Sequence, residues 1–372
     1  MPQSEPGRDS LPLPLPLAGP DRQRALISEG ALAHNLQFLR ERAGVPLLWP
    51  LKAGAYGHGV HIAARVALRA PEVWGMAVAT PAEALALANI LQKLGGQKPI
   101  LLFGPSLPQE WPALVAAGVQ LSISTAAEAE QLPPAAQAHL KVNTGMNRTG
   151  ARPAEALEVG RILAARGRLV GLYSHFSEAE EQDTALSWAQ FREFAAVARH
   201  FPGALSHMSN SAGVLNLGQL PGMRLARPGL ATYGLYPAAH VPELRPAMTF
   251  QARVTYLHAA QAGERVSYNG LTTLERPTLI ATVGAGYADG YPRRATGQGQ
   301  VSIAGERRPV LGRVCMDQMM VDATGLEVQV GDWVTLWGGD GPKLSEVAGW
   351  AEMSEYELLT RLGERVERVS VP

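Results

Sequence analysis

The sequence predicts an α/β protein of two domains, an N-terminal (β/α)8 barrel of the TIM type followed by a mostly antiparallel β domain. The chain has 372 residues, 46% of them hydrophobic, which is more than one compact core usually holds. From about residue 24 to 236, short β-type runs alternate with Ala- and Leu-rich helical stretches in roughly eight units, a pattern typical of parallel strands joined by helices. After Pro237, β-rich runs are separated by Gly, Asp and Pro turns, and Leu344–Glu352 is the one helical stretch.

Residues 1–20 are interpreted as an N-terminal arm. Leucine and proline alternate from Leu11 to Leu17, which excludes a helix and favours an extended, polyproline II-like segment. A targeting signal is the alternative, but it would need a basic start and a continuous apolar block. The barrel is expected to cover residues 21–239 and the β domain residues 240–372.

The predicted barrel strands begin with Ala25–Ile27 and end with Met223–Ala226, and the predicted helices include Glu29–Arg42 and Pro108–Ala117. A doubly wound open sheet is the alternative. No Gly-x-Gly-x-x-Gly turn follows the first strand, so a dinucleotide-binding fold has little support.

The composition excludes several classes of function. Lys plus Arg equals Asp plus Glu, at 33 each, which gives no reason to expect nucleic acid or an anionic membrane as a partner. Cys315 is the only cysteine, so no intrachain disulfide forms and a reducing, cytoplasmic location is expected. No window has eighteen uninterrupted apolar residues, and the histidines show no metal-binding spacing.

Lys52 follows a short apolar run, Val45–Leu51, and begins a turn rich in glycine and small residues. Burial at the end of a strand lowers the pKa of a lysine ammonium, and the neutral amine can then attack a carbonyl and hold it as a Schiff base. Taken alone, an exposed lysine after a strand would be the simpler interpretation.

Polar or cationic side chains also follow other predicted strands. In barrels, catalytic groups lie where strands end in loops, so these side chains predict a site rather than a set of satisfied core groups. They are Lys52, Lys141 with Arg148, His175, the group His207, Asn210 and Ser211, and Arg227 with Gly229 and Leu230.

Together with motifs in the second half of the chain, these residues resemble the alanine racemase family, whose members use pyridoxal phosphate. The resemblance covers nearly the whole chain after the arm. It rests on Lys52-Ala-Gly-Ala-Tyr-Gly-His-Gly, Lys141 to Arg148, His207 to Ala212, Arg227-Pro-Gly, Val266-Ser-Tyr268, Gly286-Tyr-Ala-Asp-Gly290, Gly312 to Asp317 and Tyr356-Glu-Leu-Leu.

The resemblance implies that Lys52 forms the internal aldimine with pyridoxal 5'-phosphate and that Tyr268, from the partner subunit of a homodimer, is the second base. Inverting a stereocentre needs a proton removed on one face and returned on the other, which two opposed bases achieve on the external aldimine. His175 and Arg227 would form the supporting network, with Arg227 facing the pyridine nitrogen.

The resemblance assigns further roles by position. Arg148 and the Met316 amide would hold the substrate carboxylate, Lys141 would be carbamylated or remain an unmodified amine, and Tyr287 would narrow the entrance. The remaining cofactor ligands would be Tyr56, Asn210, Ser211, Gly229, Leu230 and Tyr356.

Three positions depart from the family pattern. Gly54 stands where Asn or Asp is usual, Asn143 where Asp is common, and Asn269 where glycine commonly follows the tyrosine. None of them removes a reacting group, although each changes a turn or a charge beside one.

The expected function is therefore the interconversion of L- and D-alanine, supplying D-alanine for peptidoglycan. Alternatives are a racemase for serine or a broader set of amino acids, a decarboxylase on the same architecture, and a non-catalytic carrier of the cofactor. Arg227 argues against the decarboxylase, and the β domain with Tyr268 argues against the carrier.

Overall fold

The computed structural model describes residues 22–372, so the predicted arm at residues 1–20 lies outside the described residues. The described chain forms two compact units. One consists mainly of residues 25–249 together with 353–362 and 368–372, and the other mainly of residues 250–352 and 363–367. Within the described residues, no helix is both long enough and apolar enough to cross a membrane.

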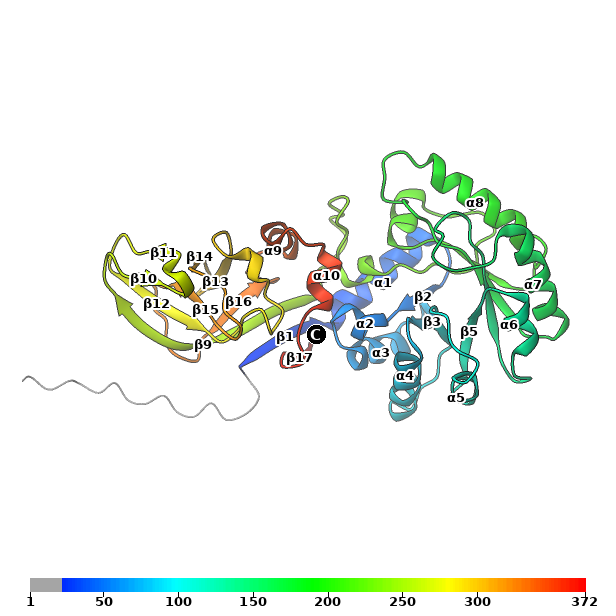
Figure 1. The fold of residues 1–372 in the computed structure, drawn as a ribbon, viewed down its shortest axis with the longest axis horizontal. Coiled ribbons are helices and arrows are strands. Elements are labelled where there is room, and N and C mark those ends of the chain that lie inside the picture. Colours follow the sequence, from blue (N-terminus) through cyan, green and yellow to red (C-terminus); the bar gives the residue numbers. More distant parts are fainter. Residues whose placement is uncertain (1–21) are drawn as a thin grey trace, which may run out of the picture. The chain divides into compact units, whose positions relative to one another are not determined.

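The barrel unit is built on seven parallel strands in chain order (Figure 1). Their side chains alternate between the barrel interior and the helices, and nearly all are buried, as expected for parallel strands covered on both faces. The strands are β2 (Leu47–Pro50), β3 (Val73–Val78), β4 (Ile100–Leu102), β5 (Val119–Ile123), β6 (Ala138–Lys141), β7 (Leu169–Tyr173) and β8 (Leu205–His207).

A short extended segment closes this sheet. Leu225 forms a parallel bridge with His207, and Ala226 forms one with Leu47, so the segment lies between β8 and β2. The predicted strand Met223–Ala226 is therefore present as single bridges. The prediction of a barrel is confirmed.

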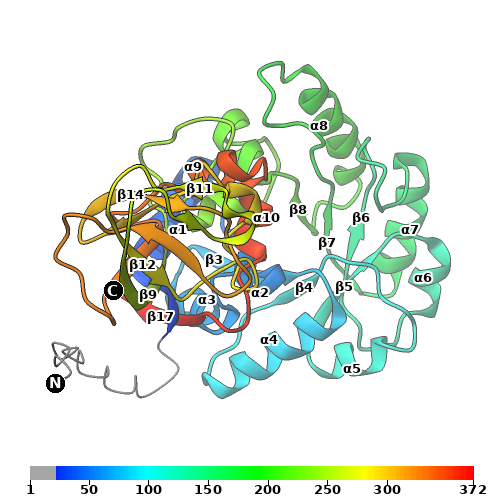
Figure 2. The same cartoon turned by 60° about the vertical axis from the view of Figure 1, so that its left-hand side comes forward.

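Helices follow the strands, and α4, α5, α6 and α7 lie on the outer side of the parallel sheet (Figure 2). Several begin at side-chain caps; Thr80 and Thr125 each start a capping box with a glutamate three residues later. The unit contains α1 (Glu29–Ala43), α2 (Lys52–Tyr56), α3 (Val60–Arg69), α4 (Pro81–Lys93), α5 (Trp111–Ala116), α6 (Ala126–Gln131), α7 (Pro153–Ala165), α8 (Ala185–Ala198), α10 (Glu355–Thr360) and the single turns η1 (Gly213–Leu217) and η2 (Leu230–Tyr233).

The second unit is mostly antiparallel β structure, as predicted, with strands in the order β12, β15, β14, β13, β16, β9. Alternate residues of β9 are buried, which gives the sheet one packed face. The elements are β9 (Met248–Ala260), β10 (Arg265–Val266), η3 (Tyr268–Gly270), β11 (Thr272–Thr273), β12 (Thr278–Val283), η4 (Arg293–Ala295), β13 (Gln300–Ile303), β14 (Glu306–Leu311), β15 (Met319–Asp322), β16 (Trp333–Trp337) and α9 (Leu344–Ala351).

Two predictions of the fold were wrong in detail. Ala25–Ile27 belongs to β1 (Gln23–Ser28), which joins the antiparallel sheet with β17 (Glu367–Val371) rather than the barrel. A local pattern of alternating side chains predicts a strand but does not say which strand will pair with it. A second helix, α10, also follows α9, and it groups with the barrel unit.

Candidate active site

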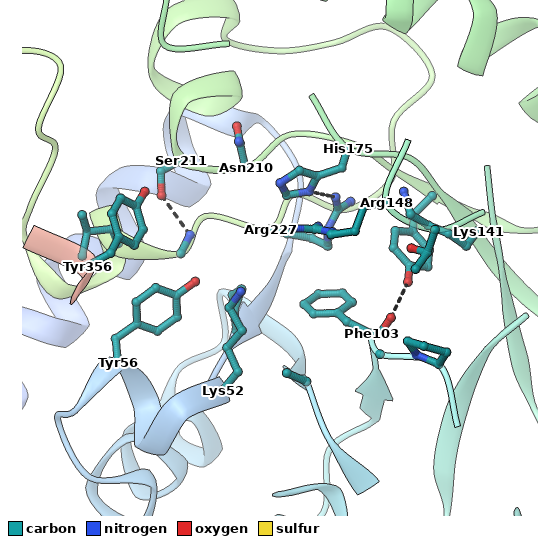
Figure 3. A pocket seen from close by; sticks show the side chains of 18 residues that line it. Lys52, Tyr56, Phe103, Lys141, Arg148, His175, Asn210, Ser211, Arg227 and Tyr356 are labelled. Carbon is teal, nitrogen blue, oxygen red and sulfur yellow. Dashed lines mark hydrogen bonds between the residues drawn. The ribbon is translucent and has the colours of Figure 1, made fainter. Parts of the chain in front are cut away.

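A cavity of about 490 Å³ lies where the barrel strands end (Figure 3). Among the described residues, none that lines this cavity is Asp or Glu, whereas Lys52, Lys141, Arg148 and Arg227 all line it, so the cavity favours an anionic ligand. The structure brings eleven predicted site residues into this wall: Lys52, Tyr56, Lys141, Arg148, His175, Asn210, Ser211, Arg227, Gly229, Leu230 and Tyr356.

Lys52 enters the cavity from an unusual turn. The four residues after it, Ala53 to Tyr56, all have left-handed backbone angles, with φ between 51° and 61°. Non-glycine residues in this conformation cost roughly 1–2 kcal/mol each, so the turn stores strain at the lysine. Figure 3 shows Lys52 and Tyr56 rising from α2 into the same space.

Gly54 fits this turn well. Its φ is +61°, and a Cβ atom placed there would meet nothing within 4 Å. Asparagine also favours the left-handed region, so Gly54 and the Asn that is usual in the family suit the same backbone.

The Lys52 amine is desolvated. Burial lowers its pKa, the Arg148 guanidinium lowers it further, and the Glu83 carboxylate raises it. A lowered pKa increases the neutral fraction of the amine, which is the form that attacks carbonyls and accepts protons.

Arg227 is a buried cation without a carboxylate partner among the described residues. Its Nη2 donates to Ser174 O at 2.7 Å and to His175 Nδ1 at 3.2 Å, and its Nη1 donates to His207 Nδ1 at 2.9 Å. Burial lowers its pKa to about 10. The guanidinium can only donate hydrogen bonds, so both histidines must present an unprotonated Nδ1 to it.

His207 links Arg227 to further hydrogen-bonded side chains in the barrel interior. Its Nε2 lies 2.8 Å from His139 Nδ1, and His139 Nε2 lies 2.9 Å from Gln120 Oε1. Burial and the nearby Arg227 hold the pKa of His207 well below its usual range and that of His139 at about 3, so both rings are neutral. Each ring therefore carries its proton on Nε2 and donates it to the next group.

A cradle of backbone amides surrounds Ser211. The amides of Gly229 and Ala231 donate to Ser211 Oγ at 2.9 and 3.1 Å. A Cβ atom on Gly229 would lie 2.6 Å from the Tyr56 hydroxyl, so only glycine allows Tyr56 to approach the backbone this closely. Neutral donors beside cationic side chains suit a phosphate.

Lys141 is buried, and burial together with Arg227 and Arg148 lowers its pKa to about 7. Its Nζ lies 4.9 Å from the Tyr173 ring centre and donates a hydrogen bond to the Val142 carbonyl at 3.3 Å. Asn143 replaces the acid common in the family; its Oδ1 accepts from the amides of Gly145 and Asn147, which shows that it braces the loop.

Tyr268 and Met316 line a different cavity, of about 880 Å³, in the antiparallel unit. Tyr268 is 67% exposed. Ser267 before it has φ 66° and ψ −176°, a region essentially reserved for glycine, and Asn269 after it has φ 61°. Asparagine tolerates that left-handed angle, so this departure from the family pattern preserves the turn.

Tyr287 is exposed in the turn from Gly286 to Gly290, and this turn packs on the segment that carries Met316. The amide of Tyr287 donates to Cys315 O at 3.1 Å, and that of Ala288 donates to Met316 O at 3.0 Å. Asp289 accepts from the Gly286 amide, as expected for a residue that caps a turn.

Several residues around these sites were not predicted from the sequence. Gln120 and His139 lie inside strands, where the sequence gives no sign that a polar side chain has a functional partner. Glu83 looks like an ordinary helix cap, and Arg365 contacts residues far from it in the sequence. Among residues 22–372, no group of three or more His, Cys, Asp or Glu could hold a metal ion.

A lysine at the end of a barrel strand, facing a cationic cavity with an amide cradle, defines a barrel enzyme that binds an anion and can form a covalent bond through an amine. Residues 27–237 match the sequence model of the alanine racemase N-terminal domain, and residues 247–370 match that of the alanine racemase C-terminal domain. The chain belongs to the alanine racemase family, which consists of pyridoxal-phosphate-dependent isomerases.

Individual relatives agree. The alanine racemase of Deinococcus radiodurans is 56% identical over 349 residues, which cover 93% of this chain and 98% of the relative. The crystal structure of alanine racemase from E. faecalis has a TM-score of 0.85 at 32% identity, covering 94% of this chain and 98% of that one. The alanine racemase from Bartonella henselae, solved with covalently bound pyridoxal phosphate, has a TM-score of 0.82 at 27% identity and covers 94% of this chain and 99% of its own.

Proposed function

We propose that this protein interconverts L- and D-alanine with pyridoxal 5'-phosphate bound in the barrel cavity. The observation that carries the proposal is Lys52, a desolvated amine directed into a cavity whose described wall contains no carboxylate. Supply of D-alanine for peptidoglycan, in the cytoplasm, belongs to the same proposal.

The residues present fit the cofactor. Ser211 and the amide of Gly229, with the hydroxyls of Tyr56 and Tyr356, would hold the phosphate, and Gly229 lies so close to the Tyr56 hydroxyl that a Cβ atom would displace it. Arg227 can only donate a hydrogen bond, so it matches a ring nitrogen that stays unprotonated. Asn210 and Leu230 complete the proposed set.

Pyridoxal phosphate, when bound, supplies an electron-withdrawing ring that acidifies the α-hydrogen of an attached amino acid. Lys52 Nζ would take the α-proton of D-alanine, and the hydroxyl of Tyr268 would give a proton to the opposite face, which yields L-alanine; the reverse reaction exchanges the two roles. His175 carries its proton on Nε2 and would support the phenol with a hydrogen bond.

Tyr268 and the Met316 amide would come from the partner subunit of a homodimer. In the antiparallel unit, Tyr268, Leu271 and Met316 are more than half exposed, and exposed apolar groups of this size favour an interface. Tyr287 would narrow the entrance.

Arg148 would bind the substrate carboxylate, and Lys141 would orient it as a carbamate. The neutral Lys141 amine adds to CO2, a nitrogen–carbon bond forms, and one proton leaves to solvent, so that a neutral amine beside Arg148 becomes an anion. A pKa of about 7 supports this step, because only the neutral amine reacts. With ¹³C-bicarbonate, NMR is expected to show a carbamate carbon that is absent in Lys141→Ala.

The function is tested by exchange of the alanine α-hydrogen in D2O, started from each enantiomer. Lys52→Ala is expected to abolish exchange and covalent attachment of the cofactor; retained exchange would overturn the proposal. Tyr268→Phe is expected to slow removal of the proton from L-alanine far more than from D-alanine, whereas the exposed control Tyr256→Phe changes neither.

Two alternatives predict other outcomes. A broader racemase would turn over serine at a rate comparable with alanine. A non-catalytic carrier would bind the cofactor and exchange no α-hydrogen at all.

A further inference from the structure

The Lys52 turn is held from outside by one carboxylate. Glu83 lies at the start of α4, thirty residues further along the chain, and its Oε1 accepts a hydrogen bond from the amide of Ala53 at 2.6 Å. Ala53 is the residue directly after Lys52 and the first of the left-handed residues. Glu83 therefore fixes the backbone at the point where the lysine enters the cavity.

The second oxygen of the same carboxylate closes the end of α4. Glu83 Oε2 accepts from the amides of Ala79 and Thr80 at 2.9 and 3.1 Å, and the Thr80 hydroxyl accepts from the Glu83 amide. The side chain thus joins the helix start to the Lys52 turn, and its position is fixed on both sides.

Glu83 also acts on the charge of the amine. In the described cavity wall, the titratable and cationic groups around Lys52 are Tyr56, Tyr173, Tyr356, Lys141, Arg148, His175 and Arg227, and none is a carboxylic acid. Glu83 is the acidic group that raises the pKa of Lys52, against burial and Arg148, which lower it.

The chain contains a matched copy of this cap without the lysine contact. At the start of α6, Glu128 Oε2 accepts from the amides of Ser124 and Thr125 at 2.8 and 2.9 Å, and the Thr125 hydroxyl accepts from the Glu128 amide. Glu83 differs from Glu128 in the additional hydrogen bond from the Ala53 amide. A comparison of the same substitution at the two positions therefore separates the effect of losing a helix cap from the effect on the Lys52 turn.

We propose that Glu83 is a positioning residue for Lys52: the Glu83 carboxylate holds the strained turn from which the lysine enters the cavity. The proposal rests on the role of Lys52 in the proposed function. It predicts that the charge of Glu83 matters at Lys52, whereas the charge of Glu128 does not.

The test compares Glu83→Gln with Glu128→Gln in the full chain. Without cofactor, the pH dependence of acetic anhydride labelling at Lys52 is followed by peptide mass spectrometry, with the exposed Lys93 and Lys343 as references. Glu83→Gln is expected to lower the apparent pKa of Lys52 measurably, because the carboxylate that raises it is lost. Glu128→Gln should leave it unchanged, while both variants lose similar thermal stability. Equal Lys52 curves in the two variants would overturn the proposal.

A second variant, Glu83→Asp, keeps the proposal testable if Glu83→Gln does not fold. Glu83→Asp keeps the charge but is one methylene shorter and cannot hold both Ala53 and the helix start. It is expected to keep the Lys52 pKa near that of the unmodified chain and, with cofactor, to lower kcat with little change in KM. A Lys52 pKa as low as in Glu83→Gln would overturn the proposal. These labelling results need no turnover, so they are distinct from the Lys52→Ala result that tests the proposed function.

Discussion

Arg227 Nη1 donates a hydrogen bond to His207 Nδ1 at 2.9 Å. His207 in turn hydrogen-bonds through Nε2 to another histidine, His139, and not to a carboxylate. Arg227 sets the direction of every hydrogen bond in this series of side chains, because a guanidinium can donate hydrogen bonds but cannot accept them. The hydrogen-bond chain then reaches Gln120, whose side-chain amide donates in turn from Nε2 to Gln137 Oε1. An amide does not relay protons as a histidine does, so the chain orients Arg227 and leaves its full charge facing the cavity.

Replacing His139 tests this chain. His139→Leu leaves the Nε2 proton of His207 and the Oε1 atom of Gln120 without a partner in a dry interior, so the free energy of unfolding should fall by about 1–3 kcal/mol. The double variant with Gln120→Leu should cost less than the two single variants together, because it removes one unpaired acceptor. Urea unfolding measures both. The exposed His200→Leu is the control and should change stability by less than about 0.5 kcal/mol.

The buried Lys141 makes stability depend on pH. Its pKa is about 7 in the folded protein, against 10.5 for an ordinary lysine, so the unfolded chain binds more protons between these values. The free energy of unfolding should therefore rise with pH from about 7 to about 10, by up to about 5 kcal/mol. Lys141→Met should raise stability near pH 7 and flatten this dependence.

Urea unfolding of cofactor-free, CO2-free protein at several pH values measures this effect. The exposed Lys93→Met should keep the slope of the unmodified chain. An unchanged slope in Lys141→Met would show that Lys141 is not the group responsible.

The amide cradle predicts a cofactor effect at Gly229. A Cβ atom there would lie 2.6 Å from the Tyr56 hydroxyl, so Gly229→Ala must displace one of the groups proposed to hold the phosphate. The dissociation constant of pyridoxal phosphate should rise between about tenfold and a hundredfold. Gly203 has open space around it, so Gly203→Ala is the matched control. Titration of the cofactor-free protein measures both, and equal affinities would remove Gly229 from the site.

The sequence was sufficient for the barrel and for most of the cavity wall because both depend on local patterns. Alternating strands and helices predict parallel strands, and the polar residue after each strand then lies at one end of the barrel. This reasoning places Lys52, His175 and Arg227 together without knowledge of any contact. The same reasoning assigned Ala25–Ile27 to the wrong sheet, because pairing is decided by tertiary packing and not by the strand's own residues.

The residues that the sequence did not reveal are those whose role depends on a partner far along the chain. His139 is meaningful only beside His207, and Glu83 only beside Ala53. The strain at Ser267 was likewise invisible, since serine gives no signal of a backbone angle that glycine prefers. Close approaches such as Gly229 to Tyr56 require the folded geometry.

Arg365 is the last such residue, and it ties two loops of the antiparallel unit. Its Nη1 donates to Asp317 Oδ1 at 2.7 Å, beside Met316, and its Nε forms an ion pair with Asp289 Oδ1 at 3.0 Å, beside Tyr287. The Asp289 side chain is fully buried, and its Oδ1 has no well-aligned hydrogen bond, so the Arg365 charge is what balances it.

Arg365→Gln should therefore leave a buried carboxylate unbalanced and lower the free energy of unfolding by about 1–3 kcal/mol. Because the same side chain aligns the segment with the Met316 amide, the variant should also raise KM for alanine more than it lowers kcat. Arg361→Gln is the control, since Arg361 pairs with the half-exposed Glu357 one helical turn away and its loss should cost less than about 0.5 kcal/mol. Equal losses of stability in the two variants would show that Arg365 is an ordinary surface cation, because an exposed ion pair cannot balance a buried charge.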